Sequence, residues 1–169
     1  MGITIHYQGR LRSEQELELV LDLVRNGARS LGWALKDVNN AHGTLERVRD
    51  AAEQNYRGPI RGVVVQPHAD SEPFQVLFGD DLLMQDYCKT QFSSIETHIA
   101  IIQLLQRVAP HFDPLVVEDE GEFWETQDRT RLRDLWNGFD ATLSRLVEEN
   151  PDARIKIRLP SGRILDALG

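Results

Sequence analysis

The sequence is poor in the features that mark secreted and membrane proteins. It contains one cysteine, Cys88, so no internal disulfide can form, and this favours a reducing cytosol. Its first residues lack the basic region and the apolar run of a signal peptide. No stretch approaches the ~20 apolar residues of a membrane span. We therefore expect a cytoplasmic protein with no membrane partner.

Positive charge is scarce as well. The chain has 19 lysines and arginines against 27 aspartates and glutamates, a net charge of −8. Such an excess of negative charge argues against nucleic acid as a partner. No Walker loop, G-x-S-x-G elbow or Rossmann fingerprint is present. No motif fixes a reaction, so the sequence leaves open whether the protein is an enzyme.

What is present is an ordinary globular composition. The chain has 169 residues, of which 41% are apolar, and this length is most simply one domain. We expect a single α+β domain over residues 1–169. Residues 1–125 would form the core sheet and two main helices, and residues 126–169 would add a C-terminal helix and a terminal strand or hairpin.

Alternating apolar residues and short β-branched runs predict the strands. These are expected at residues 3–8, 33–38, 62–66, 74–78, 81–85 and 115–118, with Gly79-Asp80 as a two-residue hairpin turn. Helices packed on a mixed, largely antiparallel sheet would follow. At the C-terminus, residues 154–159 alternate basic and apolar side chains and precede a second short run, 163–168, which reads as a hairpin or an edge strand.

Apolar residues at helical spacing predict three main helices. Two open with capping boxes, Ser13-x-x-Glu16 and Ser93-x-x-Glu96, and the third would be capped by Thr126 or Asp128. Gly32 would end the first helix and Pro110 the second. Residues 44–54 predict a further short helix, carrying Leu45, Val48 and Ala52 on one side.

The predicted order of strands brings three loops together. If the strand at 62–66 runs upward, the next runs down and the strand at 81–85 returns upward. The second helix then starts at the top, and the strand at 115–118 also ends there. Loops 67–73, 89–98 and 118–125 would meet at one end of the sheet, where binding sites are commonly built. Their candidate ligand-binding residues are His68, Asp70, Glu72, Lys89, Gln91, His98, Glu118, Glu120 and Glu122.

Three groups of these residues have two interpretations each. His98 lies on the apolar face of its helix, as a hydrogen-bonded core histidine or as a ligand or base. His68, Asp70 and Glu72 alternate, as in a solvated turn or in a site for Zn²⁺, Mn²⁺ or Fe²⁺. The acidic run at 118–125 is either an exposed strand end or a cluster that a cation offsets, such as Lys89 or a divalent metal.

Three functional hypotheses follow. The first is a binding or interaction protein whose polar pocket takes a cation or a small polar molecule with positive charge. The second is a metal-assisted hydrolase, with a divalent metal held by a subset of loop residues such as His68, His98 and Glu120. The third is a homo-oligomeric or protein-binding module that pairs through the strand at 154–159.

The stretches QPHADSEPF, KTQF with a histidine-bearing helix behind it, and DEGEFWET resemble a family of bacterial cytosolic proteins. The resemblance covers roughly residues 60–126, with a similar N-terminal strand around Tyr7-Gln8-Gly9. The family has no assigned activity. The resemblance therefore implies a bacterial cytosolic setting and no particular reaction.

Overall fold

The computed structural model describes residues 3–49, 51–149, 156–158 and 164–166. It has an α+β fold, which confirms the predicted class. Its elements are β1 (Thr4–Leu11), α1 (Gln15–Ser30), β2 (Ala34–Leu45), β3 (Val48–Arg49), β4 (Ala52–Glu53), β5 (Tyr56–Gln66), β6 (Phe74–Phe78), β7 (Leu83–Lys89), α2 (Ile95–Val108), a 3-10 turn (Ala109–His111), β8 (Phe112–Asp119), α3 (Phe123–Thr126), α4 (Arg129–Glu149), β9 (Lys156–Arg158) and β10 (Ile164–Asp166).

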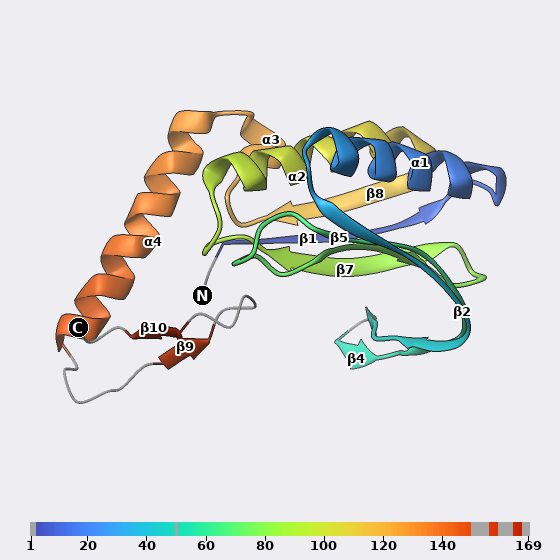
Figure 1. The fold of residues 1–169 in the computed structure, drawn as a ribbon, viewed down its shortest axis with the longest axis horizontal. Coiled ribbons are helices and arrows are strands. Elements are labelled where there is room, and N and C mark those ends of the chain that lie inside the picture. Colours follow the sequence, from blue (N-terminus) through green and yellow to red (C-terminus); the bar gives the residue numbers. More distant parts are fainter. Residues whose placement is uncertain (1–2, 50, 150–155, 159–163, 167–169) are drawn as a thin grey trace.

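Two three-stranded antiparallel sheets form the body, with strand orders β7-β1-β8 and β2-β5-β6. Helices α1 and α2 lie side by side over one face of these strands (Figure 1). Within the part of the chain that the structure describes, no helix covers the opposite face, which we call the open face. Among the described residues, the body therefore has two layers, and its helices cover one side of the sheets.

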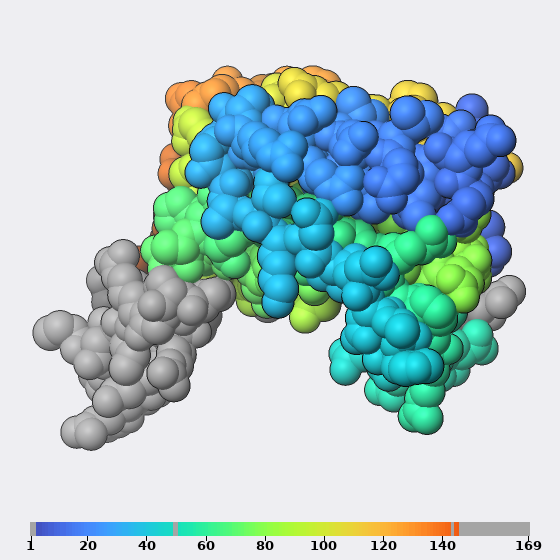
Figure 2. All heavy atoms as spheres, turned by 45° about the vertical axis from the view of Figure 1, so that its right-hand side comes forward, coloured from blue at the N-terminus to red at the C-terminus, as the bar shows by residue number. Residues whose placement is uncertain are grey.

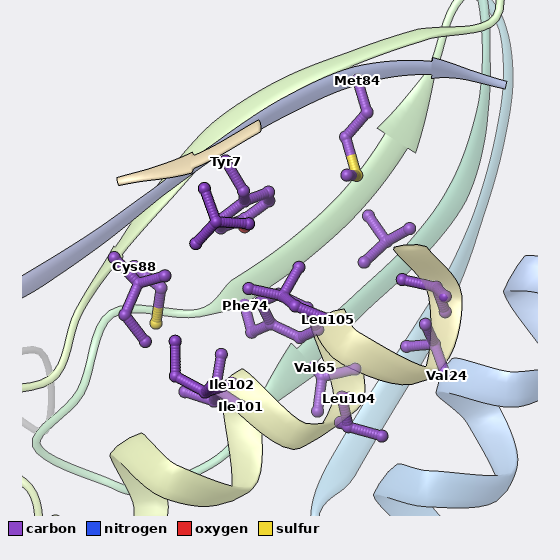
Figure 3. Close-up of a cluster of buried hydrophobic side chains, with 14 of the residues drawn as sticks. Tyr7, Val24, Val65, Phe74, Met84, Cys88, Ile101, Ile102, Leu104 and Leu105 are labelled. Carbon is purple, nitrogen blue, oxygen red and sulfur yellow. The ribbon is translucent and has the colours of Figure 1, made fainter. Parts of the chain in front are cut away.

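The pattern of β1 shows why its two sides differ. Ile5 and Tyr7 are buried beneath the helices, whereas His6 and Gln8 are exposed, as a strand period of two requires. Figure 3 shows Ile101, Ile102 and Leu105 of α2 directed toward side chains of the strands, including Tyr7, Phe74 and Cys88. One continuous apolar core therefore occupies the space between the helices and the sheets.

Strands β6 and β7 are consecutive and adjacent, yet they belong to different sheets. No ladder joins these two fully described strands. Instead the buried hydroxyl of Tyr7 donates to the carbonyl of Gln75 at 2.9 Å and accepts from its N–H at 3.2 Å. Farther along, the N–H of Glu72 donates to the carbonyl of Lys89 at 3.1 Å. A narrow seam thus divides the body, and a phenol bridges it.

The far halves of β2 and β5 continue beyond the sheet and carry the short hairpin β3–β4. We call residues 44–56 the arm; it projects on the open-face side of the body (Figure 1). Its structure shows that the predicted helix at 44–54 is wrong. Leu45 pairs with Tyr56 across the two strands, and Val48 pairs with Glu53. Residues 44–54, whose apolar spacing predicts a helix, instead form a strand, a turn and a second strand.

The main helices are confirmed with small shifts at their ends. The cap of α2 is Ser94, whose hydroxyl accepts from the N–H of Thr97 at 3.1 Å, rather than Ser93. No side-chain capping bond is made at Glu14, the cap of α1, so the box at Ser13 does not form. Gly32 ends α1 in the left-handed region, with φ of +70°, where glycine carries no steric penalty.

The predicted reversal at Gly79-Asp80 is longer than two residues. The N–H of Leu82 donates to the carbonyl of Gly79 at 3.0 Å, and Leu82 adopts a positive φ of 59°. The return strand therefore begins at Leu83 rather than at Asp81. After this turn, β7 pairs with β1 rather than with β6.

The third predicted helix is α4, and Asp128 caps it by accepting from the N–H groups of Thr130 and Arg131. Leu132 and Trp136 are buried, whereas Leu135 of the predicted stripe is 38% exposed. Strands β9 and β10 pair antiparallel, which confirms the hairpin form of the C-terminal segment. The outer parts of the predicted runs 154–159 and 163–168 lie outside the described residues.

Candidate binding groove on the open face

A groove of about 1070 Å³ lies on the open face. Side chains from β1, β6, β7 and β8 form its floor, and the arm forms its wall. In Figure 2 the arm, in cyan and green, hangs below the body as a separate lobe. The volume slightly exceeds the ~300–1,000 Å³ typical of small-molecule sites, so the groove has room for an extended segment of a larger partner.

The floor is built by cross-strand pairs whose side chains point away from the helices. His6 lies opposite Tyr87, with ring centroids 5.7 Å apart, and Gln8 lies opposite Gln85. On the other side of β1, His6 lies opposite Glu118. This register therefore gathers an imidazole, a phenol, two amides and a carboxylate on one surface.

Apolar surface is also exposed along the groove. Tyr87 is 51% exposed, Val116 41% and Val48 56%, although side chains of this size are usually covered. Tyr87 and Val116 come from the floor and Val48 from the arm. Exposed apolar side chains that gather within one concave surface are typical of binding sites rather than of an ordinary solvent face.

The charges of the groove are strongly one-sided. Among the side chains that the structure describes, five carboxylates line it, those of Glu46, Glu53, Glu72, Asp86 and Glu118. The same described lining includes one arginine, Arg47, and its guanidinium is bound to the carboxylate of Asp81. The groove therefore presents a negative potential around its aromatic and apolar centre.

The titration of two floor residues reflects this crowding. The pKa of Tyr87 is raised above its usual value, first by the charge of Glu72, then by partial burial and by the charges of Asp86 and Glu46. Burial, together with the charge of Glu72, raises the pKa of Asp86 to about 6, although the N–H of Tyr87 donates to this carboxylate and opposes the rise. Carboxylates from the arm and from the floor thus act on the same small region.

Arg47 holds the arm in place. Its guanidinium donates two hydrogen bonds to Asp81, at 2.6 and 3.2 Å, and one to the carbonyl of Leu83 at 2.6 Å. It also lies over the ring of Tyr56, 4.9 Å from the centroid. Beside it, the side-chain amide of Gln85 donates to the carbonyl of Val48 and accepts from its N–H, as a paired strand would. The wall of the groove is therefore anchored to the start of β7.

The three loops predicted to converge do lie at one end of the sheets. The carboxylate of Glu72 accepts from the N–H of Lys89 at 3.1 Å, which joins the first loop to the second. His98 lies 3.1 Å from Asp119, which joins the second to the third. Their side chains nevertheless point in different directions. Among the nine predicted site residues, Glu72 and Glu118 line the groove.

His98 belongs to a buried polar cluster. Its side chain is fully buried; Nδ1 lies 2.8 Å from the hydroxyl of Thr90, and Nε2 lies 3.1 Å from Asp119. Trp136 meets the imidazole edge-on, with centroids 5.9 Å apart. Of the two interpretations of His98, the structure therefore supports a hydrogen-bonded histidine in the core. The cluster ties the start of α2 to the end of β8 and to α4.

Asp119 is the centre of this cluster. Its carboxylate accepts from the N–H groups of Gly121, Phe123 and Trp124, at 2.8 to 3.0 Å. Burial alone would raise the pKa of Asp119, but the contact with His98 and these backbone donors hold it below the usual value. The acidic run therefore has a structural anchor at its buried member, while the neighbouring Glu118 faces the groove.

The other predicted residues lie apart. His68 and Asp70 interact within their own loop, where His68 Nδ1 accepts from the N–H of Asp70. Gln91 is buried, and the carboxylate of Glu120 accepts from the N–H of Thr4. Glu122 pairs with an arginine of α4, Arg131. Over the described residues, no group of three or more histidine, cysteine, aspartate or glutamate side chains is arranged to hold a metal ion.

Sequence reasoning missed most of the groove. The floor residues His6 and Tyr87 alternate with buried neighbours, and this signal identifies an outward face. Two main helices in the first 125 residues are enough to cover one face only, which implies that the other is open. No such signal was available for Glu46 and Glu53, because the arm reads as a helix.

Comparison of the chain with protein-family models, with curated proteins and with solved structures finds no match. In the part of the chain that the structure describes, no helix has the length and apolar character to cross a membrane. The groove and its chemistry are therefore the basis for a functional assignment.

Proposed function

We propose that the protein is a binding protein whose open-face groove takes a positively charged polypeptide segment. The observation that carries the proposal is the one-sided charge of the groove: five carboxylates surround it, and the guanidinium of Arg47 is occupied by Asp81. Carboxylates crowded in this way repel one another, and a cation between them relieves that repulsion.

The size and the apolar content of the groove favour a polypeptide over a small amine. Protein-binding surfaces combine an aromatic or apolar centre with a polar rim. Here Tyr87, Val116 and Val48 supply the centre, and the carboxylates of Glu46, Glu53 and Glu118 supply the rim. A basic segment with apolar side chains between its cations satisfies both parts.

A thermal-shift and fluorescence-anisotropy experiment tests the proposal. The probe is a labelled peptide of alternating arginine and isoleucine residues, titrated into the full chain, with spermine as a small-cation comparison. Replacing Glu46, Glu53 and Glu118 by glutamine removes three exposed negative charges. Each ion pair that such a charge forms with the peptide contributes ~0.2–1 kcal/mol, so the loss of all three should weaken peptide binding by about tenfold.

The matched control carries the same change of charge at exposed positions that do not line the groove: Asp113→Asn, Glu125→Gln and Asp134→Asn. We expect the control to bind the peptide as the wild type does. Equal weakening in both variants would show only a general effect of net charge and would reject the groove as the site. Spermine binding as tightly as the peptide would reject a polypeptide ligand.

We also propose a bacterial cytoplasmic setting. It is supported by the resemblance over residues 60–126 and by the single cysteine. Cys88 is buried in the core, and burial together with nearby carboxylates raises the pKa of its thiol, so it is an inert packing group.

A further inference from the structure

The distribution of charge along the chain is uneven at its C-terminal end. Residues 151–169 contain four basic and two acidic residues, a net charge of +2. Because the whole chain carries −8, the first 150 residues carry −10. The basic residues Arg154, Lys156 and Arg158 alternate with Ile155, Ile157 and Leu159. This end of the chain has the composition of the segment that the groove is proposed to bind.

The strands of the hairpin β9–β10 pair antiparallel. Their register places Ile157 opposite Leu165, Lys156 opposite Asp166 and Arg158 opposite Ile164. A two-stranded hairpin by itself is marginally stable in water. The hairpin therefore needs a surface that covers it.

We propose that the basic C-terminal hairpin, residues 154–166, occupies the acidic groove of its own molecule. This inference rests on the proposed function. The groove offers carboxylates to the cations at 154, 156, 158 and 163, and it offers Tyr87, Val116 and Val48 to the apolar positions. In Figure 1, β9 and β10 lie below the strands, as the arm does, but at the opposite end of the body.

Helix α4 connects the hairpin to the body. Trp136 packs against His98, and α4 continues to Glu149, 13 residues farther, which is about 20 Å of helix. A segment whose linker can span the distance to its site reaches an effective concentration near millimolar, whereas a second copy is present at micromolar concentration in ordinary solution. A moderate electrostatic attraction therefore favours the groove of the same chain over that of a neighbour.

Carbodiimide cross-linking tests the contact directly, because it joins lysine amines to carboxylates that they touch. The full chain has three lysines, Lys36, Lys89 and Lys156. We expect monomeric protein to yield a peptide that links Lys156 to Glu46, Glu53, Glu72, Asp86 or Glu118. Products that link Lys156 only to carboxylates outside this set, such as Glu148 or Asp152, would overturn the proposal.

A competition experiment supplies a second readout on the full chain. Its probe is a synthetic peptide of residues 152–168. A variant with Arg154→Gln, Lys156→Gln, Arg158→Gln and Arg163→Gln frees the groove, so we expect it to bind the probe at least about tenfold more tightly than the wild type. The control neutralises four exposed cations elsewhere, at Arg29, Lys36, Arg107 and Arg133, and should bind the probe as the wild type does.

The outcomes separate this inference from the proposed function. Equal affinity of the wild type and the neutralised-tail variant for the tail peptide overturns the inference. If the arginine–isoleucine peptide still binds the groove in that case, the proposed function stands. If neither peptide binds, both fall. Light scattering could instead show a dimer of the wild type that returns to the monomer mass of 19.3 kDa when the tail is neutralised. That result would mean that the tail of a second copy occupies the groove, and it would overturn the assignment to the same molecule.

Discussion

Asp119→Asn tests the role of the buried cluster at the end of β8. One carboxylate oxygen accepts from the N–H groups of Phe123 and Trp124, and the other accepts from Gly121 and faces His98 at 3.1 Å. Asparagine keeps the shape but replaces one oxygen with an NH₂ group. That group would face the N–H of Gly121, so at least one buried donor loses its acceptor.

The size of the effect follows from the burial of Asp119. A hydrogen bond to a charged group contributes about 1.5–3 kcal/mol, and a buried donor left without its acceptor costs about 1–3 kcal/mol. The side chain of Asp119 is fully buried, so we expect Asp119→Asn to lower the free energy of unfolding by about 3 kcal/mol at pH 7. For a chain of this length that lowers the melting temperature by about 6–12 °C.

The dependence on pH gives the sharper check. The folded-state pKa of Asp119 is below its usual value of 3.8, so its charged form stabilises the fold above pH 4. This contribution is lost as the pH falls below 3.8 toward the folded-state pKa. The difference between wild type and Asp119→Asn should therefore be constant from pH 5 to pH 8 and shrink below pH 4.

Urea denaturation followed by tryptophan fluorescence measures these free energies, since Trp136 packs on His98. Asp113→Asn is the matched control, because Asp113 is an exposed residue of the same strand. An Asp119→Asn variant within 1 kcal/mol of the wild type at pH 7, or a difference that persists unchanged at pH 3, would refute the reasoning.

Three further predictions concern the groove. The raised pKa of Asp86, about 6, means that its neutral form stabilises the fold, fully below pH 3.8 and decreasingly as the pH rises through 6. Asp86→Asn should therefore raise the free energy of unfolding at pH 8 by about 1–2 kcal/mol, which is measured as a higher melting temperature. The same change should weaken the binding of the basic peptide. A lower melting temperature would contradict the prediction. Arg47→Met should cost about 2 kcal/mol and speed amide exchange at Val48, whereas unchanged exchange would show that Arg47 does not hold the arm. Replacing residues 46–55 by Asn-Gly joins the paired residues Leu45 and Tyr56 through a tight turn. Circular dichroism should show the fold retained and anisotropy should show peptide binding lost; retained binding would exclude the arm from the site.

The sequence was most informative where each strand has one buried side. Residues 74–78 alternate under the helices, and β6 has these same bounds. The second half of β2 has little buried surface, since Asn39, Asn40 and His42 are all exposed. Without a buried side there is no period of two to recognise, so the sequence pattern predicts that the strand ends at Val38, seven residues before its actual end at Leu45.

The site was harder to predict because it depends on the order of the strands, on their register and on the position of the arm. That three loops share one end of the sheets followed from counting chain reversals. Which way each side chain points depends on register: Glu118 faces the groove, and the adjacent Asp119 faces the interior. A shift of one residue exchanges these roles. The arm then brings Glu46 to the same surface from a region where the local pattern favoured a helix.

The seam between β6 and β7 has a genetic consequence. A main-chain ladder does not depend on side-chain identity, so point mutations rarely remove it. Here the middle of the junction depends on the phenolic oxygen of Tyr7, which satisfies both the donor and the acceptor of Gln75. The step from tyrosine to phenylalanine removes that oxygen, so a change of one codon would leave both main-chain groups of Gln75 without this partner.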